Sequence, residues 1–580
     1  MISGYKSFQV EIKKTTFTSE EGNVFPLTAV LTFEVSGRKR TLEESLGYVE
    51  EETIYQWIDE GKQVNLDYCF IGRFSLENYR ISRKMDKKQE VTINGFSAKN
   101  SFLDSSLPFD FSHTIIKGES FDLTSAWFHR GAVNFDSAVF ECDMVSFHDV
   151  IFSDYRFDFK NVIVKKADVI FKNTVFGSGQ KDFQYTEFGD GELTFANAEF
   201  GDGDVSFINV DFGNGNTSYK VTRFGEGKVD FHFAKFHSGA ISFERTEFGS
   251  GRVDFRTVEF GTGKVNFNRA QFGNGDVSFE ESEKVSGKFS FKRVNFGVGD
   301  ISFEEVIFEN IDVSFERTNF GIGNISFYES IFKTMSFRFC HLDAYVDLRL
   351  QKCQSIDLSN TIVRDIIDLN PYEFEMQVDM IRFDGMRLIG RIYINWKRNH
   401  VKKLIACQED SDYRRKAEQY RILKENFSLT GQYEDEDKSY VEFKRFEARA
   451  NLQDSLKKGK INALWSYPFH WFKVALFDKA GLYATSPFRV LVTMLTIFVI
   501  FSLIFVALIA TGSADILASV DDPLSIVARS FYHSAITFLT IGYGDHFPSG
   551  SIRWLSALEG FAGLFLMSYF TVAFVRKILR

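Results

Sequence analysis

The sequence predicts a multidomain protein in which a parallel β-helix is followed by an α-helical hairpin and then by an α-helical membrane domain with two spans. Three observations support this fold class. Phenylalanine recurs every twelve residues through the middle of the chain, two amphipathic segments follow at 412–429 and 435–452, and apolar segments lie at 490–510 and 554–575. A fixed period is typical of a solenoid, and an apolar segment of about 20 residues can cross a bilayer.

These features divide the chain into six parts. We expect an α/β cap over residues 1–105, the β-helix over 106–335, irregular terminal coils over 336–400, a helical hairpin over 401–460, an interfacial helix over 461–487 and the membrane domain over 488–580. In the cap, residues 8–14 and 27–35 alternate like strands, and residues 41–62 read as an acidic helix. We interpret the cap as a cover for an open β-edge that would otherwise aggregate; ligand sensing is an alternative that no motif supports.

Composition excludes several classes of function. The formal net charge of −10 argues against general nucleic-acid binding. The five cysteines have no CxxC spacing and no histidine partners, so they indicate neither a zinc site nor a disulfide framework. The ten histidines are dispersed, and no nucleophile motif, phosphate loop or metal cluster is evident. We therefore expect neither an enzyme nor a cofactor.

The twelve-residue repeat has the local pattern Val-Ser-Phe-x-x-x-x-Phe-Gly-x-Gly. Its first phenylalanines are Phe135, Phe147, Phe159, Phe171, Phe183, Phe195 and Phe207, and the series continues from Phe231 to Phe327 in steps of twelve, with Tyr219 in the remaining slot. Val and Phe, two residues apart, point to the same side of a strand, while Ser between them points outward. The Gly-x-Gly makes the corner.

This repeat resembles the pentapeptide-repeat family, although its spacing alternates five and seven where the family keeps five. The resemblance implies a right-handed parallel β-helix with four-sided turns, each made of two repeats. With strands about 4.8 Å apart, about nine or ten turns would form a rod of about 45 Å over 106–335. We expect this rod to be a scaffold or docking surface.

Calcium at the corners is an alternative that the sequence disfavours. The residues after the second glycine are Glu192, Asp204, Asn216, Lys228, Arg252, Lys264, Asp276 and Asp300. Basic residues recur where a calcium ladder needs carboxylates, so we predict no calcium site.

The hairpin and the segment after it lead to the membrane. The first helix, 412–429, places apolar residues on one face and ends at a glycine, and the second, 435–452, turns a matching face toward it. The face residues are Ala417, Tyr420, Leu423 and Phe427 in the first helix, Gly431 after it, and Tyr440, Phe443 and Ala448 in the second. The hairpin resembles a single tetratricopeptide-like unit.

Aromatic residues crowd the segment before the first span: Trp465, Tyr467, Trp471, Phe472 and Tyr483. Aromatic side chains gather at the headgroup level of a bilayer. An interfacial helix here could carry movement of the rod to the membrane domain, or it could be a passive anchor.

Between the two spans, residues 540–545 read Thr-Ile-Gly-Tyr-Gly-Asp. Alternating glycines allow a backbone to turn its carbonyl oxygens to one side. A short amphipathic segment, 524–539, precedes this stretch and is opened by Asp521, Asp522 and Pro523. The sequence Asp-His-Phe-Pro begins at the last residue of the stretch and leads out of it. In this order the elements resemble the pore of two-transmembrane-helix potassium channels. The alternative is a Gly-rich turn between unrelated membrane helices.

The resemblance implies a selectivity filter whose carbonyl oxygens replace the water around K⁺. The filter residues would be Thr540, Ile541, Gly542, Tyr543, Gly544 and Asp545, with K⁺ held at Thr540, Ile541, Gly542 and Tyr543. One loop supplies a quarter of each carbonyl ring, so the resemblance implies a homotetramer in a lipid bilayer. Potassium ions are then the permeant species and not a cofactor.

Family spacing also assigns the residues around the filter. Tyr532 and His533 fall at the positions that hold Tyr543 from behind, and Ile536 stands where some members have a buried carboxylate. Glu559 is an ionisable group inside a membrane helix and so a functional candidate. We expect it to brace the filter from behind; a hydrogen bond to the pore helix without influence on gating is the alternative.

In the second span the resemblance assigns a hinge and a cavity. Gly563 falls at the family's hinge, with Gly560 as a near rival, although either glycine could serve close helix packing instead. The residues expected to line the cavity are Leu564, Met567, Thr571 and, near the narrowing, Val575.

Basic residues near the spans predict the orientation. Lys457, Lys458, Lys460, Lys473, Lys479 and Arg489 precede the first span, and Arg576, Lys577 and Arg580 follow the second, whereas the loop carries Asp515, Asp521 and Asp522. We therefore expect a multi-pass protein of the cell membrane with both termini in the cytoplasm.

The leading hypothesis is a tetrameric potassium-selective channel without a voltage sensor, regulated or positioned by a cytoplasmic β-helix. The alternatives are a weakly selective cation channel and a membrane-anchored β-helix that binds a cytosolic partner.

Overall fold

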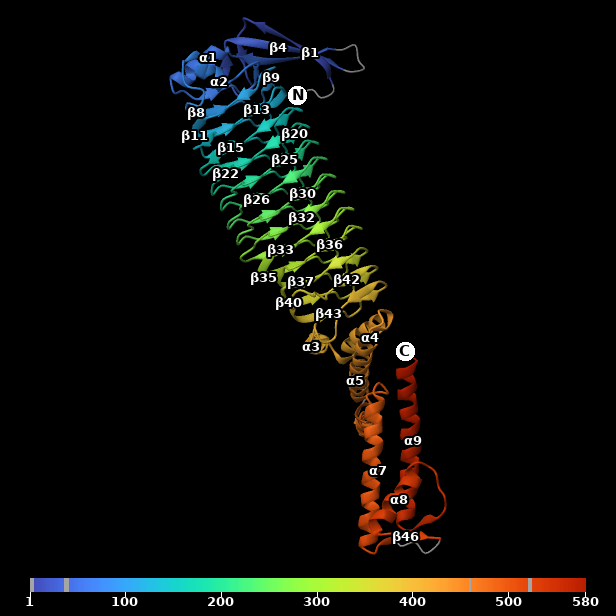
Figure 1. Cartoon of the computed structure of the whole chain (residues 1–580). Coiled ribbons are helices and arrows are strands. Elements are labelled where there is room, and N and C mark those ends of the chain that lie inside the picture. The colour runs from blue at the N-terminus through green and yellow to red at the C-terminus, as the bar shows by residue number, and fades with distance from the viewer. Residues whose placement is uncertain (1–4, 36–40, 458–459, 520–523, 580) are drawn as a thin grey trace. The chain divides into compact units, whose positions relative to one another are not determined.

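The computed structural model describes residues 5–35, 41–457, 460–519 and 524–579. It separates into two compact units, Met1–Leu404 and Ile405–Arg580. The first unit is a β-solenoid with a cap, and the second is helical (Figure 1).

The solenoid completes one turn every 24 residues through most of its length. Val205 pairs with Val229, which pairs with Val253, all in parallel register. Two twelve-residue repeats therefore make one turn, and the predicted β-helix with a phenylalanine-lined core is confirmed.

The solenoid has four walls, and each turn adds one short strand or a single bridge to each wall. One wall holds β10 (Phe109–Asp110), β13 (Val133–Asn134), β17 (Phe157–Asp158), β21 (Lys181–Asp182), β25 (Val205–Ser206), β28 (Val229–Asp230), β30 (Val253–Asp254), β32 (Val277–Ser278), β34 (Ile301–Ser302), β36 (Ile325–Ser326), β39 (Val346–Asp347), β42 (Ile366–Asp368) and β45 (Arg391–Tyr393). The opposite wall holds β6 (Val64–Asn65), β8 (Val91–Ser97), β11 (Thr114–Asp122), β15 (Met144–Ser146), β19 (Asp168–Ile170), β23 (Leu193–Thr194), β26 (Thr217–Ser218), β29 (Ile241–Ser242), β31 (Val265–Asn266), β33 (Lys288–Ser290), β35 (Ile307–Ser314), β37 (Ile331–Ser336), β40 (Lys352–Asp357) and β43 (Gln377–Arg382). The two remaining walls have fewer strands. The third wall holds β9 (Phe102–Asp104), β12 (Trp127–Arg130), β16 (Ile151–Phe152), β20 (Val175–Phe176), β24 (Glu199–Phe200) and β27 (Arg223–Phe224), and it continues with β38 (His341–Leu342), β41 (Ile362–Val363) and β44 (Arg387–Leu388). The fourth wall holds β14 (Val139–Phe140), β18 (Ile163–Val164) and β22 (Glu187–Phe188). Single bridges extend these two walls between the short strands.

Columns of stacked aromatic rings fill the core. Phe243 lies between Tyr219 and Phe267, with ring centroids 4.8 and 4.6 Å away and nearly parallel planes. Phe255, in the second column, meets Phe243 edge-on at 5.6 Å. Both geometries are favourable for aromatic rings, so the repeat period itself generates the stacking.

The corners require glycine because each one lies directly on the corner of the turn before it. A Cβ on Gly215 would lie 1.8 Å from the carbonyl oxygen of Gly191. No side chain fits at such a distance, and this explains the Gly-x-Gly of the repeat.

Beyond Phe337 the solenoid continues with shorter turns. Ser326 pairs with Asp347 and Asp347 with Asp368, a spacing of 21 residues in each case, before Asp368 pairs with Tyr393. No glycine occurs in the two 21-residue turns, whereas the 25-residue turn that follows them contains Gly390, where a Cβ would lie 1.8 Å from the Asp365 carbonyl oxygen.

The N-terminal strands extend one wall of the solenoid. β1 (Tyr5–Lys13), β4 (Leu27–Val35) and β5 (Thr41–Tyr48) are antiparallel, and β5 pairs with β7 (Cys69–Ile71), which leads to β9. A small hairpin, β2 (Phe17–Thr18) with β3 (Val24–Phe25), and the helices α1 (Glu51–Asp59) and α2 (Leu76–Ser82) complete this region. The predicted acidic helix over 41–62 is therefore wrong in its first half, because pairing with β4 overrides the local preference of that segment.

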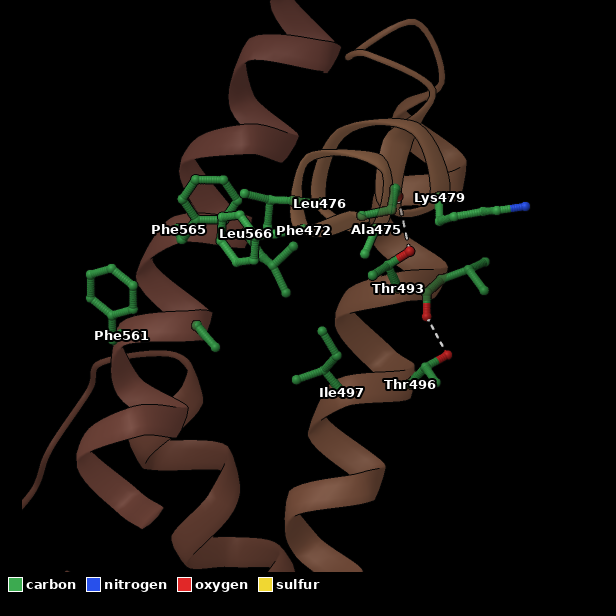
Figure 2. Close-up of a pocket in the computed structure, with 13 residues that line it drawn as sticks. Phe472, Ala475, Leu476, Lys479, Thr493, Thr496, Ile497, Phe561, Phe565 and Leu566 are labelled. Atoms are coloured by element: carbon green, nitrogen blue, oxygen red, sulfur yellow. Dashed lines mark hydrogen bonds between the residues drawn. The ribbon is translucent and has the colours of Figure 1, made fainter. Parts of the chain in front are cut away.

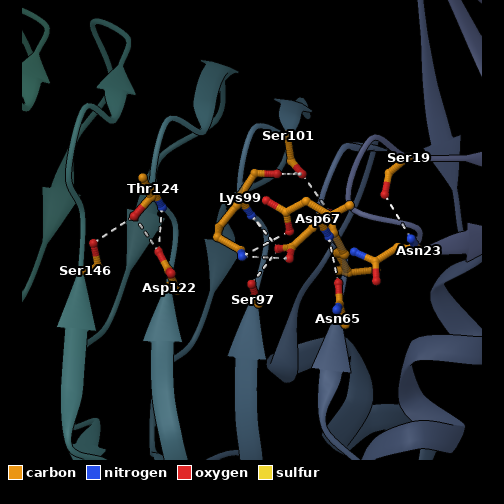
Figure 3. Close-up of polar contacts among 12 residues, drawn as sticks. Ser19, Asn23, Asn65, Asp67, Ser97, Lys99, Ser101, Asp122, Thr124 and Ser146 are labelled. Carbon is orange, nitrogen blue, oxygen red and sulfur yellow. Dashed lines mark hydrogen bonds and ion pairs between the residues drawn. The ribbon is translucent and has the colours of Figure 1, made fainter.

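A buried carboxylate joins β6 and β8, the first two strands of the wall that begins with β6 (Figure 3). Asp67, 2% exposed, accepts a hydrogen bond from the backbone N of Lys99 at 2.7 Å and one from Ser97 Oγ. The Lys99 ammonium lies 3.4 Å from the same carboxylate. These contacts tie the end of β6 to the end of β8.

The helical unit begins with a hairpin. After α3 (Val401–Ala406), α4 (Tyr413–Leu429) is capped by Asp412, whose carboxylate accepts from the Arg415 N at 2.8 Å, and packs against α5 (Tyr433–Lys457). Tyr420 stacks on Phe446 at 5.5 Å. The prediction that Tyr440 faces the first helix is wrong: its ring lies under the Arg576 guanidinium instead.

The membrane domain follows. Its elements are α6 (Lys460–Lys473), the π-helix η1 (Val474–Lys479), α7 (Pro487–Ala510), β46 (Ala514–Ala518), α8 (Ile526–Phe538), β47 (His546–Gly550) and α9 (Ile552–Ile578). Among the described residues, α7 and α9 are the helices long and apolar enough to cross a membrane. On α6, Trp465 and Trp471 are 77% and 63% exposed. Of the basic residues that predict the orientation, Lys458 and Arg580 lie outside the described residues.

Candidate functional site

The backbone at the end of α8 turns sharply into residues 540–545. Ser525 caps the start of α8 by accepting from the Ala528 N, while the predicted opening residues Asp521, Asp522 and Pro523 lie outside the described residues. After the helix, the N–H groups of Ile541 and Gly542 both donate to the carbonyl oxygen of Ile536, at 2.9 and 3.3 Å.

Every second residue of this stretch has a left-handed backbone. The φ angles are +57° at Thr540, +59° at Gly542 and +78° at Gly544. Glycine adopts such angles without steric cost, so the two glycines of the motif lie where the backbone needs them.

The carbonyl oxygens of Thr540, Ile541, Gly542 and Tyr543 accept no hydrogen bond from any residue that the structure describes. All four residues are exposed on the single chain. The C-terminal end of α8, where helix carbonyls concentrate negative potential, directly precedes them. The arrangement offers a row of unengaged oxygen ligands, which suits a hard monovalent cation better than an anion.

Tyr532 forms a hydrogen bond with Asp545, the last residue of the stretch, and none with Tyr543 is present among the described residues. Its Oη donates to Asp545 Oδ2 at 2.7 Å, whereas Tyr543 is 71% exposed. Ser519 adds two bonds from the other side, from its Oγ to the Gly544 carbonyl at 3.0 Å and from its N to the Asp545 carbonyl at 2.8 Å. Within one chain, therefore, Tyr532 braces Asp545.

Two polar contacts join α8 to α9 behind the stretch. His533 is buried, with its Nε2 2.9 Å from Ser556 Oγ. Glu559 is fully buried and accepts a hydrogen bond from Ser534 Oγ, while its Oε2 has no hydrogen-bond partner among the described residues. His533 and Glu559 thus connect α8 to α9, and neither forms a hydrogen bond with Tyr543 in the part of the chain that the structure describes.

Sequence reasoning missed Ser534 and Ser556, the partners of these two side chains. Ser534 lies next to His533 and four residues after Ser530, on the face of α8 that the structure buries. A run of small polar residues on one face of a membrane helix is a signal that could have identified it.

A two-stranded antiparallel sheet also joins the segments on either side of α8 and the stretch, and it was not predicted. β46 pairs antiparallel with β47, with Ile516 opposite Pro548. It ties the loop after α7 to the segment after Asp545, so the stretch is anchored at both ends.

In α9, Gly563 is a close-packing position. A Cβ there would lie 2.0 Å from the Phe538 carbonyl oxygen, whereas at Gly560 the nearest atom would be 3.7 Å away. The helix is continuous through both glycines. The structure thus favours the packing interpretation of Gly563 and leaves a hinge untested.

The predicted cavity residues lie together on the opposite, exposed side of α9. These are Leu564, Met567, Thr571 and Val575, all exposed on the single chain. The buried side, which includes Leu566 and Tyr569, faces α7 and η1.

Near its C-terminal end, α9 is attached to the segment before the first span by Tyr569. The Tyr569 hydroxyl accepts from the Ala484 N at 2.9 Å and donates to the Phe477 carbonyl at 3.0 Å. Next to these bonds, an apolar cavity of about 760 Å³ separates η1 from α7 and α9; Phe472, Leu476, Ile497, Phe561 and Phe565 line it (Figure 2). Apolar contacts add to the polar bonds, because Tyr569 belongs to a buried cluster with Ala480, Ala484 and Val490.

The end of α9 is held by the hairpin. Asp437 of α5, 7% exposed, accepts from Arg576 Nη2 at 3.0 Å and from Lys577 Nζ at 2.9 Å. The Arg576 guanidinium also lies over the Tyr440 ring at 4.5 Å. A second pair, Arg445 with Asp478 at 2.8 and 3.0 Å, joins α5 to η1. We call the contacts of Asp437 and Tyr440 with Arg576 and Lys577 the α5–α9 clamp.

One cluster of possible metal ligands occurs in the described part of the solenoid. Atoms of Asp230, His232 and Asp254 lie within 4.8 Å of one another. Arg256 Nη2 lies 2.7 Å from Asp254 and Lys228 Nζ lies 2.7 Å from Asp230. These cations already neutralise the carboxylates, so the cluster does not suit a metal.

Comparison with protein families identifies an ion channel domain: a family model described as "Ion channel" matches residues 493–580. No curated protein and no solved structure matched the chain. The match extends from within α7 to the end of the chain and includes α8, residues 540–545 and α9. Together with the two apolar helices, it indicates an ion channel domain located in a membrane.

Proposed function

We propose that this chain forms a homotetrameric, potassium-selective channel whose filter is residues 540–545. The observation that carries the proposal is the row of four carbonyl oxygens, Thr540 to Tyr543, that accept no hydrogen bond in the described structure. A dehydrated K⁺ ion needs such oxygens on all sides, and one chain presents them on one side only. Four copies around an axis would complete the rings.

Exposure of apolar side chains supports the assembly. Ile541 is 46% exposed, and Leu564 on α9 is 57% exposed. In a tetramer, Leu564, Met567, Thr571 and Val575 would line the water-filled cavity below the filter, while neighbouring subunits would cover Tyr543. Contacts behind Tyr543 would then come from another copy of the chain.

Orientation and regulation follow from the same arrangement. Basic residues such as Arg489, Arg576 and Lys577 lie at the start of the first span and at the end of the second, which supports a cytoplasmic location for the hairpin and the solenoid. The α5–α9 clamp joins the helical hairpin directly to the end of the second span. The role that we assign to the hairpin is regulation of the pore through these contacts.

Selectivity is tested by reconstituting the full chain in planar bilayers and measuring reversal potentials under bi-ionic K⁺ and Na⁺. We expect a strong preference for K⁺, and a loss of that preference in Gly542→Ala, because alanine disfavours the +59° φ of that position. Gly512→Ala is the matched control: Gly512 has φ +67°, and a Cβ added there would meet no atom within 4 Å, as at Gly542, but it lies outside the stretch.

Equal permeability of the two ions in the unmodified protein would instead favour the weakly selective cation channel. A protein without conductance that retains a soluble partner through its solenoid would favour the membrane-anchored binding module. Equal loss of selectivity in both glycine variants would show that general strain, and not the filter, is being measured.

A further inference from the structure

The two opposite edges of the solenoid carry opposite charge over overlapping turns. On one edge, Arg245, Arg269, Arg293 and Arg317 occupy equivalent positions on four successive turns, each two residues after a core phenylalanine. All four have left-handed φ angles near +60° and exposed side chains. We call this column the arginine ladder.

Backbone bonds hold the ladder in register. The Arg269 N donates to the Lys292 carbonyl at 2.9 Å, and the Arg293 N donates to the Glu316 carbonyl at 3.0 Å. Successive arginines are therefore separated by one strand spacing, about 4.8 Å. Like charges at that spacing repel one another.

None of the four arginines forms an ion pair with a residue that the structure describes, although neighbouring columns are paired, as in Lys292 with Glu316 at 3.2 Å. Arg317 only lies over the Phe339 ring, at 5.4 Å. A chain with a net charge of −10 thus leaves a row of repelling cations without counter-charges of its own.

The opposite edge has the matching column of carboxylates. Glu281, Glu305 and Glu329 lie two residues after Phe279, Phe303 and Phe327 and also have left-handed backbones. Glu281 and Glu305 are exposed, and Glu329 is half-buried. None of the three forms an ion pair within the described ranges. We call this column the glutamate ladder.

The two ladders are half a turn apart. Arg269 follows β31 and Glu281, twelve residues later, follows β32, and these strands belong to opposite walls. Above the ladders, the equivalent positions hold Val221 on one edge and Thr257 on the other. The arginine ladder therefore begins one and a half turns before the glutamate ladder, and the two ladders, which have the same spacing, overlap between Arg269 and Glu329.

We propose that the solenoids of neighbouring subunits associate edge to edge, with the arginine ladder of one copy against the glutamate ladder of the next. A rotation about an axis parallel to the solenoid keeps the height of every residue, so each glutamate of one copy lies within half a strand spacing, about 2.4 Å, of the height of an arginine of the next copy, and Arg245 alone has no glutamate at its level. The interface is heterologous, and a heterologous interface closes into a ring when its rotation is a whole fraction of a full turn, as in a fourfold assembly. The inference rests on the homo-oligomer of the proposed function.

A linear polyanion, such as an acidic peptide or a nucleic acid, would match the arginine ladder alone. It gives no reason for three glutamates with the same spacing on overlapping turns of the other edge. A second copy of this chain accounts for both ladders, and for this reason we choose it.

Cysteine cross-linking of the full chain tests the interface. The background is Cys407→Ser, because Cys407 is the exposed free cysteine and the other four are buried. Gln271→Cys on the arginine edge and Glu283→Cys on the glutamate edge replace exposed residues at equivalent positions. We expect mild oxidation to link subunits only when both cysteines are present; linkage by either cysteine alone would indicate a different, isologous contact and would overturn the proposal.

Charge reversal supplies the specificity control. Arg269→Glu with Arg293→Glu should lower the cross-linked fraction at least about tenfold, because like charges face each other. Adding Glu281→Arg and Glu305→Arg restores complementarity and should restore the linkage, which no merely structural role of these residues explains. Absence of this rescue would refute the interface. It would also be refuted if the arginine reversal removed a bound polyanion and left the cross-linked fraction unchanged.

Native mass and bi-ionic reversal potentials on the same samples separate this inference from the proposed function. A K⁺-selective tetramer that does not cross-link overturns the solenoid interface alone. Cross-linked solenoids in a protein that is not tetrameric, or does not select K⁺, leave the interface standing and overturn the proposed pore.

Discussion

Removing the carboxylate of the α5–α9 clamp provides the most direct test of coupling between the hairpin and the second span. Asp437 is buried and binds two cations, Arg576 at 3.0 Å and Lys577 at 2.9 Å. Asp437→Asn keeps the size of the side chain but removes the charge that both cations face. We expect the variant to weaken the attachment of the end of α9 to α5.

The size of the effect follows from the exposure of the partners. A hydrogen bond to a charged group contributes about 1.5–3 kcal/mol when buried, and an exposed ion pair contributes less than about 1 kcal/mol. The side chains of Arg576 and Lys577 are 21% and 44% exposed, so the clamp lies between these limits. We expect a loss of about 1–2 kcal/mol, a factor of about 5 to 30 in an equilibrium.

If the clamp forms in only one of two gating states, this factor appears directly in the ratio of open to closed channels. Single-channel recordings in planar bilayers measure that ratio. The expected result is a shift of about 5- to 30-fold toward the state in which α5 and α9 are apart, with unchanged single-channel conductance because the filter is not altered.

The control for this variant is Glu425→Gln. Glu425 pairs with Arg421 at 3.3 Å on an exposed face of α4 and makes no contact with α9. An open-to-closed ratio that is the same for Asp437→Asn, Glu425→Gln and the unmodified protein would refute the coupling through the clamp. An equal shift in both variants would show that the charge of the hairpin, and not the clamp, matters.

Three further predictions concern stability. Phe243→Ala removes a fully buried ring from the middle of an aromatic column and should cost about 3–5 kcal/mol, which thermal unfolding of the solenoid by circular dichroism would show. Gly563→Ala places a methyl group 2.0 Å from the Phe538 carbonyl and should lower the stability of the membrane domain by about 1–3 kcal/mol, measured as the melting temperature in detergent. Lys284 occupies a core slot of the repeat, 3% exposed, and donates to the Phe260 and Gly263 carbonyls; burial lowers its pKa from 10.5 to about 8. The folded state then binds fewer protons than the unfolded state between these values, so the free energy of unfolding should rise with pH from about 8 to 10.5, and Lys284→Met should remove this share of the rise.

Each of these predictions has a neighbouring control. Phe233→Ala truncates a ring that is 47% exposed, and a loss as large as that of Phe243→Ala would contradict the core stacking. Gly560→Ala has its nearest atom at 3.7 Å; if it destabilises as much as Gly563→Ala, close packing is not the reason. Lys288→Met changes an exposed lysine of the same corner, and it should leave the pH dependence of stability as it is.

Much of the solenoid could be predicted because its determinants are local and repeated. A phenylalanine every twelve residues specifies which side chains point inward, and each glycine corner repeats with the same period. Pairing at 24 residues follows once two repeats make one turn. The first half of the segment 41–62 was predicted wrongly because pairing with β4, the strand that precedes it in the chain, overrides the local pattern of the segment.

Around residues 540–545 the sequence indicated the motif and the order of the elements, and the role of these residues as a filter stays a prediction. It did not indicate that Tyr532 bonds Asp545 or that Ser534 bonds Glu559. Such pairs depend on how α8 and α9 rotate against each other, and residue spacing along a helix leaves that rotation open. The strands β46 and β47 carry no alternating pattern from which their pairing could have been predicted.

Spacing within short segments is enough to indicate the periodic features, namely the aromatic core of the solenoid, the two apolar spans and the glycines of the stretch between them. The folded chain was needed to show which side chains meet across segments: Asp437 with Arg576, Tyr569 with the backbone before the first span, and Gly563 with Phe538. The physical reason is that these contacts join residues that are far apart in the chain, and packing alone selects them from many pairs with equal local preference.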